Sequence, residues 1–153
     1  MRATTIAVLF PLVFSVPLHA QSRCRLVGVW ELVSGKADGQ PYPANLHQWK
    51  FITRARWAWV AKRDTTVTEM KTASDSLKVA NTTEGAGGTY TLQDTTYTEK
   101  IEFFPDRAYV GLSVPFACRT EGDRFYQTGG MPILEGGRTV RTLKLEEVWR
   151  RIE

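Results

Sequence analysis

Most of the chain alternates between apolar and polar residues in short runs, and Gly, Pro or Asp separates one run from the next. This pattern is typical of antiparallel strands joined by tight turns. The predicted strands cover residues 26–34, 48–53, 56–62, 89–92, 96–104, 109–114, 116–120, 124–128 and 139–152. No strand–helix–strand alternation and no repeat interrupts the series. The pattern therefore predicts one all-β domain, an up-and-down sandwich or barrel.

One internal stretch departs from the alternation. Residues 63–84 are polar, rich in Thr, Ser, Asp and Lys, and have no period of two. Within them, residues 69–79 carry Met70, Leu77 and Val79 as weak apolar anchors for one or two helical turns. We expect a short helical or irregular crossover, or a lid, near residues 64–84.

The first 20 residues are predicted to be a secretory signal peptide. Arg2 supplies a positive start, residues 6–18 are apolar almost throughout, and Ala20 offers a small residue for cleavage before Gln21. The apolar run is shorter than the roughly 20 residues that span a bilayer. An uncleaved anchor is the alternative. We expect a single domain over residues 21–153, secreted or periplasmic in a bacterium, with no stable membrane insertion after cleavage.

Two cysteines, Cys24 and Cys118, follow the leader. In an oxidising compartment they are expected to pair, and the bridge would close a loop of about 95 residues, which stabilises by about 4–5 kcal/mol in the chain-entropy model. Two free thiols are the alternative. His47 is the only histidine beyond the leader, and it forms no metal-ligand spacing with the cysteines. No metal and no cofactor are predicted.

Charge argues against a nucleic-acid partner. The chain carries 20 basic and 16 acidic residues, and removal of Arg2 with the leader leaves 19 minus 16, or +3. Residues 54, 56, 62 and 63 form a modest basic cluster among strand-like aromatics. A nucleic-acid interface needs a concentrated basic face, so we interpret the charge as a solvated surface. The sequence does not determine the oligomeric state.

Three segments of the chain occur in the same order as in a known group of β-barrel proteins. They are Gly28-Val29-Trp30, residues 87–92 running into 96–99, and residues 147–151. Together they resemble the calycin superfamily, in particular bacterial lipocalin-like domain proteins of uncharacterised function. The resemblance implies a closed antiparallel barrel of about eight to ten strands with one open end. It also implies that Trp30 plugs the closed end beneath Arg150 or Arg151 as a cation–π pair. No established activity comes with it.

The strand predicted over residues 96–104 indicates where a site lies. Its period of two places Tyr97, Glu99, Ile101 and Phe103 on one face and Thr96, Thr98, Lys100, Glu102 and Phe104 on the other. Because Lys100 and Glu102 suit solvent, Glu99 is expected to point inward, as are Tyr90 and Leu92 of the neighbouring strand. A buried carboxylate must be paired or have a raised pKa. Polar groups among apolar walls are typical of a small-molecule pocket. The alternative is that an internal Arg or Lys neutralises Glu99, whose role is then structural.

Three functions remain open. The first is an exported protein that binds a small hydrophobic or amphipathic molecule in a cavity of about 300 Å³ or more. Its predicted lining residues are Trp57, Trp59, Tyr90, Tyr97, Glu99 and Phe103. The second is an isomerase- or cyclase-type enzyme that uses Glu99 or His47 as acid or base and Tyr97 as donor. The third is a structural or interaction module with a filled core and an exposed apolar patch. No nucleophile-elbow Ser and no phosphate loop is found, so no residue is assigned as catalytic.

Overall fold

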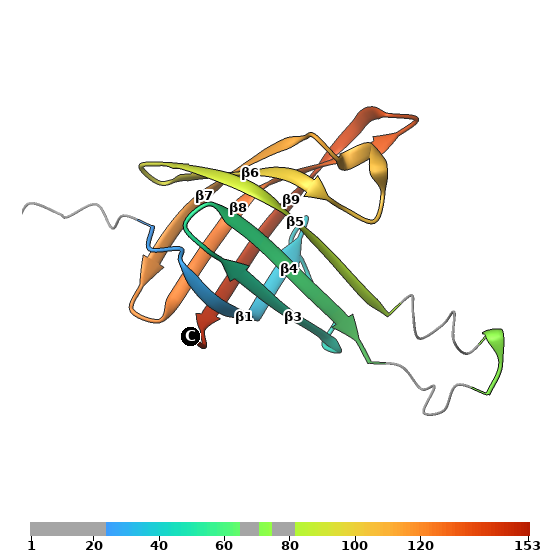
Figure 1. Ribbon diagram of the computed structural model, residues 1–153, viewed down its shortest axis with the longest axis horizontal. Helices are drawn as coiled ribbons and strands as arrows, with labels where there is room; N and C mark the ends of the chain where they lie inside the picture. Colours follow the sequence, from blue (N-terminus) through green and yellow to red (C-terminus); the bar gives the residue numbers. More distant parts are fainter. Residues whose placement is uncertain (1–23, 65–70, 75–81) are drawn as a thin grey trace, which may run out of the picture.

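The fold is an antiparallel β-barrel. The computed structural model describes residues 24–64, 71–74 and 82–153. Its strands are β1 (Gly28–Ala37), β2 (Gln40–Pro41), β3 (Leu46–Ile52), β4 (Arg56–Arg63), β5 (Thr83–Gln93), β6 (Thr96–Phe103), β7 (Ser113–Glu121), β8 (Arg124–Glu135) and β9 (Arg138–Arg151). A 3-10 helix, η1 (Arg107–Tyr109), lies between β6 and β7. The strands wrap around a common interior (Figure 1), and the predicted all-β class is confirmed.

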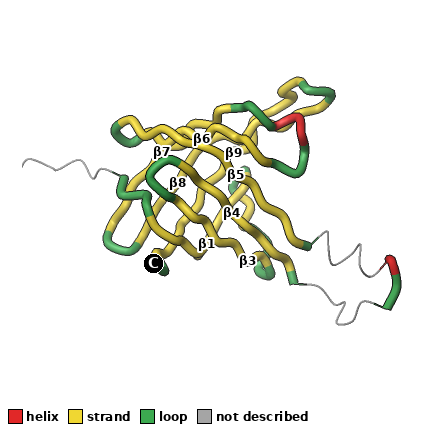
Figure 2. The backbone as a smooth tube through the Cα atoms, in the orientation of Figure 1, coloured by secondary structure: helices red, strands yellow, loops and turns green. Residues whose placement is uncertain are grey.

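Closure of the sheet follows the order of the chain. From β3 to β9 each strand pairs antiparallel with the next, and β1 pairs with both β3 and β9. Within the described residues, eight strands thus form the closed barrel, and the short β2 adds a ribbon at the end of β1. The tube in Figure 2 shows the same arrangement of strands. This topology fits a lipocalin-like barrel.

The indole of Trp30 in β1 is fully buried. Its Nε1 donates a hydrogen bond of 2.7 Å to the Leu26 carbonyl oxygen. The guanidinium carbon of Arg151 lies 4.1 Å from the indole centroid, a cation–π contact. Arg150 instead pairs with Glu31 outside the barrel. The predicted cation–π pair is present, with Arg151 as its cation.

A disulfide joins Cys24, ahead of β1, to Cys118 in β7. The Cα atoms are 6.1 Å apart, and both residues are buried. The predicted pairing is confirmed. Because disulfides persist in oxidising compartments, this bond is in keeping with an extracytoplasmic environment.

Strand β5 begins earlier than the sequence predicted. The predicted strand started at residue 89, but the preceding Gly85-Ala86-Gly87-Gly88 also lies inside the strand and pairs with β4. The pairing of β5 with β6 shifts by one residue between Gly87 and Gly88. A Cβ atom on Gly88 would overlap the Lys100 carbonyl oxygen, so the close approach of the two strands requires glycine there. The shift marks a β-bulge at these glycines.

The segment after β6 also differs from the prediction. Residues 109–114 were expected to form a strand, but Asp106 accepts a hydrogen bond of 2.9 Å from the Ala108 amide and starts η1. The next strand, β7, begins at Ser113 and continues through Pro115, so two predicted strands become one. Likewise β8 runs through Gly129 and Gly130 to Glu135.

Two predictions fall on other parts of the chain. The leader over residues 1–20 lies outside the described residues. Most of the crossover near 64–84 also lies outside them. Of the helical turns expected over 69–79, only residues 71–74 are described. Within the described residues, no helix has the length and apolar character needed to cross a membrane.

Candidate functional site

A cavity of about 250 Å³ lies inside the barrel. Its apolar walls include Trp57, Trp59, Ala61, Ile101, Phe104, Val114, Phe116, Met131 and Leu145. Its polar lining includes Tyr42, Gln48, Lys50, Arg63, Glu84, Glu99, Gln127 and Glu147. The volume is below the expected 300 Å³, and the lining includes two large side chains that were not predicted to face inward, Lys50 and Phe104.

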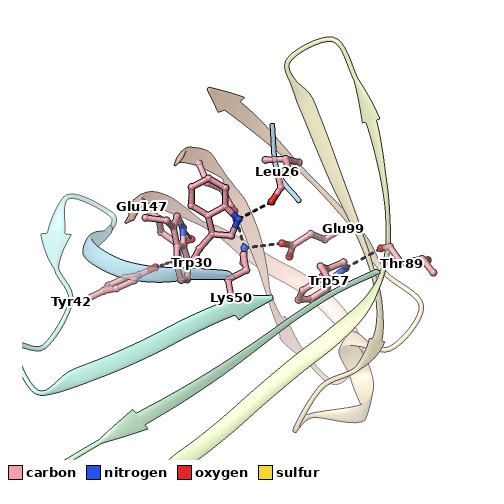
Figure 3. Close-up of polar contacts among 10 residues, drawn as sticks. Leu26, Trp30, Tyr42, Lys50, Trp57, Thr89, Glu99 and Glu147 are labelled. Atoms are coloured by element: carbon pink, nitrogen blue, oxygen red, sulfur yellow. Dashed lines mark hydrogen bonds and ion pairs between the residues drawn. The ribbon is translucent and has the colours of Figure 1, made fainter. Parts of the chain in front are cut away.

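Lys50 is the centre of the polar lining. It projects from β3 and is 2% exposed. Its Nζ donates hydrogen bonds of 2.9 Å to Glu99 Oε1 in β6 and 2.8 Å to Gln127 Oε1 in β8 (Figure 3). The ammonium also lies 5.1 Å from the ring centroid of Trp149 and 5.7 Å from that of Tyr97. A buried charge must be paired and hydrogen-bonded, and these contacts meet that need.

Glu99 was predicted to point inward, and it does. It is 6% exposed, while its neighbour Lys100 faces solvent. Of the two roles considered for it, the ion pair with Lys50 matches neutralisation by an internal cation. Glu99 also lines the cavity, so neutralisation leaves it beside any molecule that enters.

In strand β3, Lys50 faces inward and the large apolar residues face outward. Trp49 is 50% exposed and Phe51 is also exposed, whereas Lys50 and Ile52 are buried. The period of two puts Lys50 on the same face as Ile52, and Ile52 packs in the core. The apolar pattern of this strand therefore conceals which face is inside.

A second buried carboxyl group belongs to Glu147 in β9. Tyr42 donates its hydroxyl to Glu147 Oε1 at 2.9 Å, and Trp149 Nε1 lies 3.3 Å from Oε2 (Figure 3). Burial raises the pKa of Glu147 above its usual range, although the Lys50 charge and these hydrogen bonds oppose the shift. Burial, and then the charge of Glu147, raises the pKa of Tyr42.

Tyr42 reaches Glu147 because residue 35 is glycine. The Tyr42 amide donates a hydrogen bond of 2.9 Å to the Gly35 carbonyl oxygen. A Cβ atom on residue 35 would overlap the Tyr42 ring, so only glycine leaves room for that ring against β1. We call Tyr42, Lys50, Glu99, Gln127 and Glu147 the polar cluster.

Three of the six predicted lining residues, Trp57, Trp59 and Glu99, line the cavity. Tyr90 and Tyr97 do not line it but pack against each other, with ring centroids 5.1 Å apart. The Tyr90 hydroxyl donates to the Thr53 carbonyl oxygen at 2.8 Å. The buried Tyr97 hydroxyl has no hydrogen-bond partner in the described part of the chain. Burial and then the Glu99 charge raise the pKa of Tyr97.

The predicted inward position of Phe103 is wrong. Phe103 is 67% exposed and lies on the outside of the barrel. The bulge explains the change, because Gly88 pairs with Ile101 and Gly87 with Phe103, which leaves Glu102 as an extra residue. The alternation reverses after Glu102, and Phe104 turns inward to stack on Tyr109.

Leu92 was also expected to face inward, but it is exposed beside the Asp94 turn. It forms the second-to-last residue pair of the β5–β6 hairpin, with Tyr97 opposite. Burial at the end of a hairpin depends on where the barrel wall stops, which the period of two does not reveal.

His47 lies on the outside of the barrel. Its side chain is 64% exposed, and its Nε2 is 3.3 Å from Asp64 Oδ2. A histidine in this position cannot exchange a proton with a molecule inside the cavity, because proton transfer needs hydrogen-bond reach. His47 therefore does not share the cavity with Glu99, and its role as an acid or base stays a prediction.

Four residues of the polar cluster were missed by the sequence reasoning. For Glu147 a signal existed, because it lies two residues before Trp149 in a predicted strand and so shares its face. Gln127 stands in the same relation to the buried Phe125. Lys50 and Tyr42 had no local signal.

Comparisons with known proteins add no family assignment. No protein-family model matches the chain, and a search of curated proteins finds no relative. Among the described residues, no group of three or more His, Cys, Asp and Glu side chains is placed to hold a metal ion. The barrel topology fits a calycin-like fold, and the site's chemistry must be argued from its own geometry.

The buried ion pair yields a stability prediction. Lys50→Met leaves the Glu99 carboxylate buried without its cation, and we expect a loss of about 3–5 kcal/mol in the free energy of unfolding. The double variant Lys50→Met/Glu99→Leu should lose much less, because no buried charge remains. Urea denaturation measures both. Lys62→Met, an exposed lysine in β4, is the control. A loss in Lys50→Met no larger than in this control would contradict the assignment.

Glu147 yields a prediction about pH. Because burial raises its pKa, the folded protein keeps a proton that the unfolded chain releases near its ordinary pKa of about 4.3. The stability that Glu147 contributes is present below that pH and is lost as the pH rises through the raised value. We expect Glu147→Gln to gain stability relative to wild type as the pH rises from about 4.3 toward neutrality.

Chemical denaturation across this pH range tests the expectation. Glu146→Gln is the matched control, since Glu146 is the next residue of β9 and pairs with Lys144 outside the barrel at 3.0 Å. A stability difference between Glu147→Gln and wild type that stays constant with pH would show that Glu147 does not titrate in this way.

Proposed function

We propose that this protein is an exported calycin-like barrel that binds a small amphipathic molecule in its cavity. The observation that carries the proposal is the cavity of about 250 Å³, which combines aromatic walls with the polar cluster. Binding sites generally combine apolar walls with a few convergent polar groups. A cavity of about 150 Å³ is enough to hold benzene. The ligand is therefore the size of one or two rings, smaller than a drug-sized molecule.

The two kinds of lining residue suggest how the ligand is oriented. Its apolar part packs against Trp57, Trp59 and Phe104, whose rings offer large contact areas. Its polar part meets Lys50 and Gln127, which are already held in place by their mutual hydrogen bond of 2.8 Å. Side chains fixed in advance lose little entropy on binding, which favours affinity.

Two observations favour this proposal over a filled structural module and over an enzyme that uses His47. A structural module would have a filled core, and this core contains a cavity. An enzyme using His47 would need that residue inside the barrel, whereas it is exposed. The Gly28-Val29-Trp30 segment and the Arg151 contact support the proposed calycin membership.

Filling the cavity tests the proposal. Ala61 is buried in β4 and lines the cavity, and Ala58 is on the outer face of the same strand. We expect native mass spectrometry of the purified wild-type protein to show a bound small molecule. Ala61→Phe should lose it because the new ring occupies its space, and Ala58→Phe should retain it. A bound mass that survives Ala61→Phe, or a wild-type protein without any, would count against the cavity as a binding site.

Export is a separate part of the proposal. The leader sequence and the Cys24–Cys118 bond support it. We expect the protein recovered from outside the cytoplasm to begin at Gln21, and N-terminal sequencing of that fraction measures this. Recovery only in the cytoplasm, with Met1 still present, would contradict export.

A further inference from the structure

The polar cluster has hydrogen-bond donors to spare. The Lys50 ammonium carries three N–H groups, of which two are used by Glu99 and Gln127. Gln127 must turn its oxygen toward Lys50, since an amide nitrogen cannot accept, and so its NH2 group points elsewhere. Neither this NH2 group nor the third N–H of Lys50 has a hydrogen-bond partner among the described residues. Both side chains line the cavity.

The acceptors of the polar cluster are largely occupied. Each oxygen of Glu147 already receives a hydrogen bond, one from Tyr42 and one from Trp149. Glu99 accepts from Lys50 at 2.9 Å, and its charge acts on the nearby Tyr97 hydroxyl. A ligand group that brings only N–H donors would meet oxygens that, apart from Glu99 Oε2, already accept a hydrogen bond.

The charges around the cavity also compensate one another. Lys50 is neutralised by Glu99, and Arg63 pairs with Glu84 at 3.0 Å. The remaining acid is Glu147, whose burial favours its neutral form. An incoming carboxylate would find no uncompensated cation and would approach two carboxyl groups. An incoming ammonium would approach Lys50. Either charge would lose its hydration without a matching partner.

We propose that the cavity selects an uncharged molecule that carries a carbonyl-type oxygen, as in a ketone or amide, over a carboxylate or amine of the same shape. The oxygen accepts hydrogen bonds from Gln127 and Lys50, and the apolar body lies against the aromatic walls. This inference rests on the proposed function, since it specifies the ligand class of the same cavity.

A matched series of one-ring compounds tests the inference. Acetophenone, benzamide, benzoate and benzylamine share a phenyl ring and differ in the polar group. We expect NMR chemical-shift titrations of the purified protein at neutral pH to give at least tenfold lower Kd values for acetophenone and benzamide than for benzoate and benzylamine. Tightest binding of benzoate or benzylamine would overturn the inference and leave the binding function intact. Shifts from none of the four at cavity residues would count against the proposed function itself.

Two variants test the physical cause of the selection. Glu99→Gln keeps an acceptor for Lys50 but leaves its charge uncompensated, so benzoate should gain at least tenfold in affinity relative to benzamide. Glu102→Gln is the control, because Glu102 lies on the same strand and pairs with Arg56 on the outside. Gln127→Met removes the amide donors and should weaken benzamide at least tenfold. If Glu99→Gln does not fold, Gln127→Met decides, and unchanged benzamide affinity in that variant overturns the inference.

Discussion

The buried ammonium group of Lys50 constrains the rest of the structure, because removing a charge from water costs free energy. Lys50 is 2% exposed, and a charge in such a place is tolerated only with close partners. Those partners come from β6 and β8, on the far side of the barrel from β3. The hydrogen bonds to Glu99 and Gln127 therefore connect three strands that do not neighbour one another. A slip in register by one residue would turn one of these groups outward and leave the Lys50 ammonium without that partner.

The same constraint shapes the cavity. A lumen filled only by apolar side chains would pack closely and leave no defined polar surface. Here the polar cluster occupies one part of the interior, and aromatic rings form the rest of the wall. Tyr42 and Glu147 extend the cluster toward β9, and the absence of a side chain at Gly35 makes room for Tyr42. The interior thus combines directional donors with a small apolar volume, which is the basis of the proposed ligand selection.

Several features of the site could be predicted because they depend on residues close together in sequence. Lys100 and Glu102 belong outside, so the period of two places Glu99 inside, and the structure agrees. The same rule failed four residues later at Phe103, because the bulge opposite Gly87 and Gly88 adds a residue to β6. A bulge is set by how two backbones meet, and the alternation of a single strand carries no record of it.

The sequence by itself determined the all-β class, since strand periodicity is enough for it. Cysteine number and an oxidising compartment favoured the pairing of Cys24 with Cys118, and the resemblance to calycins implied the contact of Trp30 with Arg150 or Arg151. Only the tertiary structure decided that Lys50 lies inside while Trp49 lies outside. Hydrophobicity alone favours the opposite arrangement. The arrangement holds because Glu99, Gln127 and the surrounding rings, contributed by distant strands, together offset the desolvation of one cation.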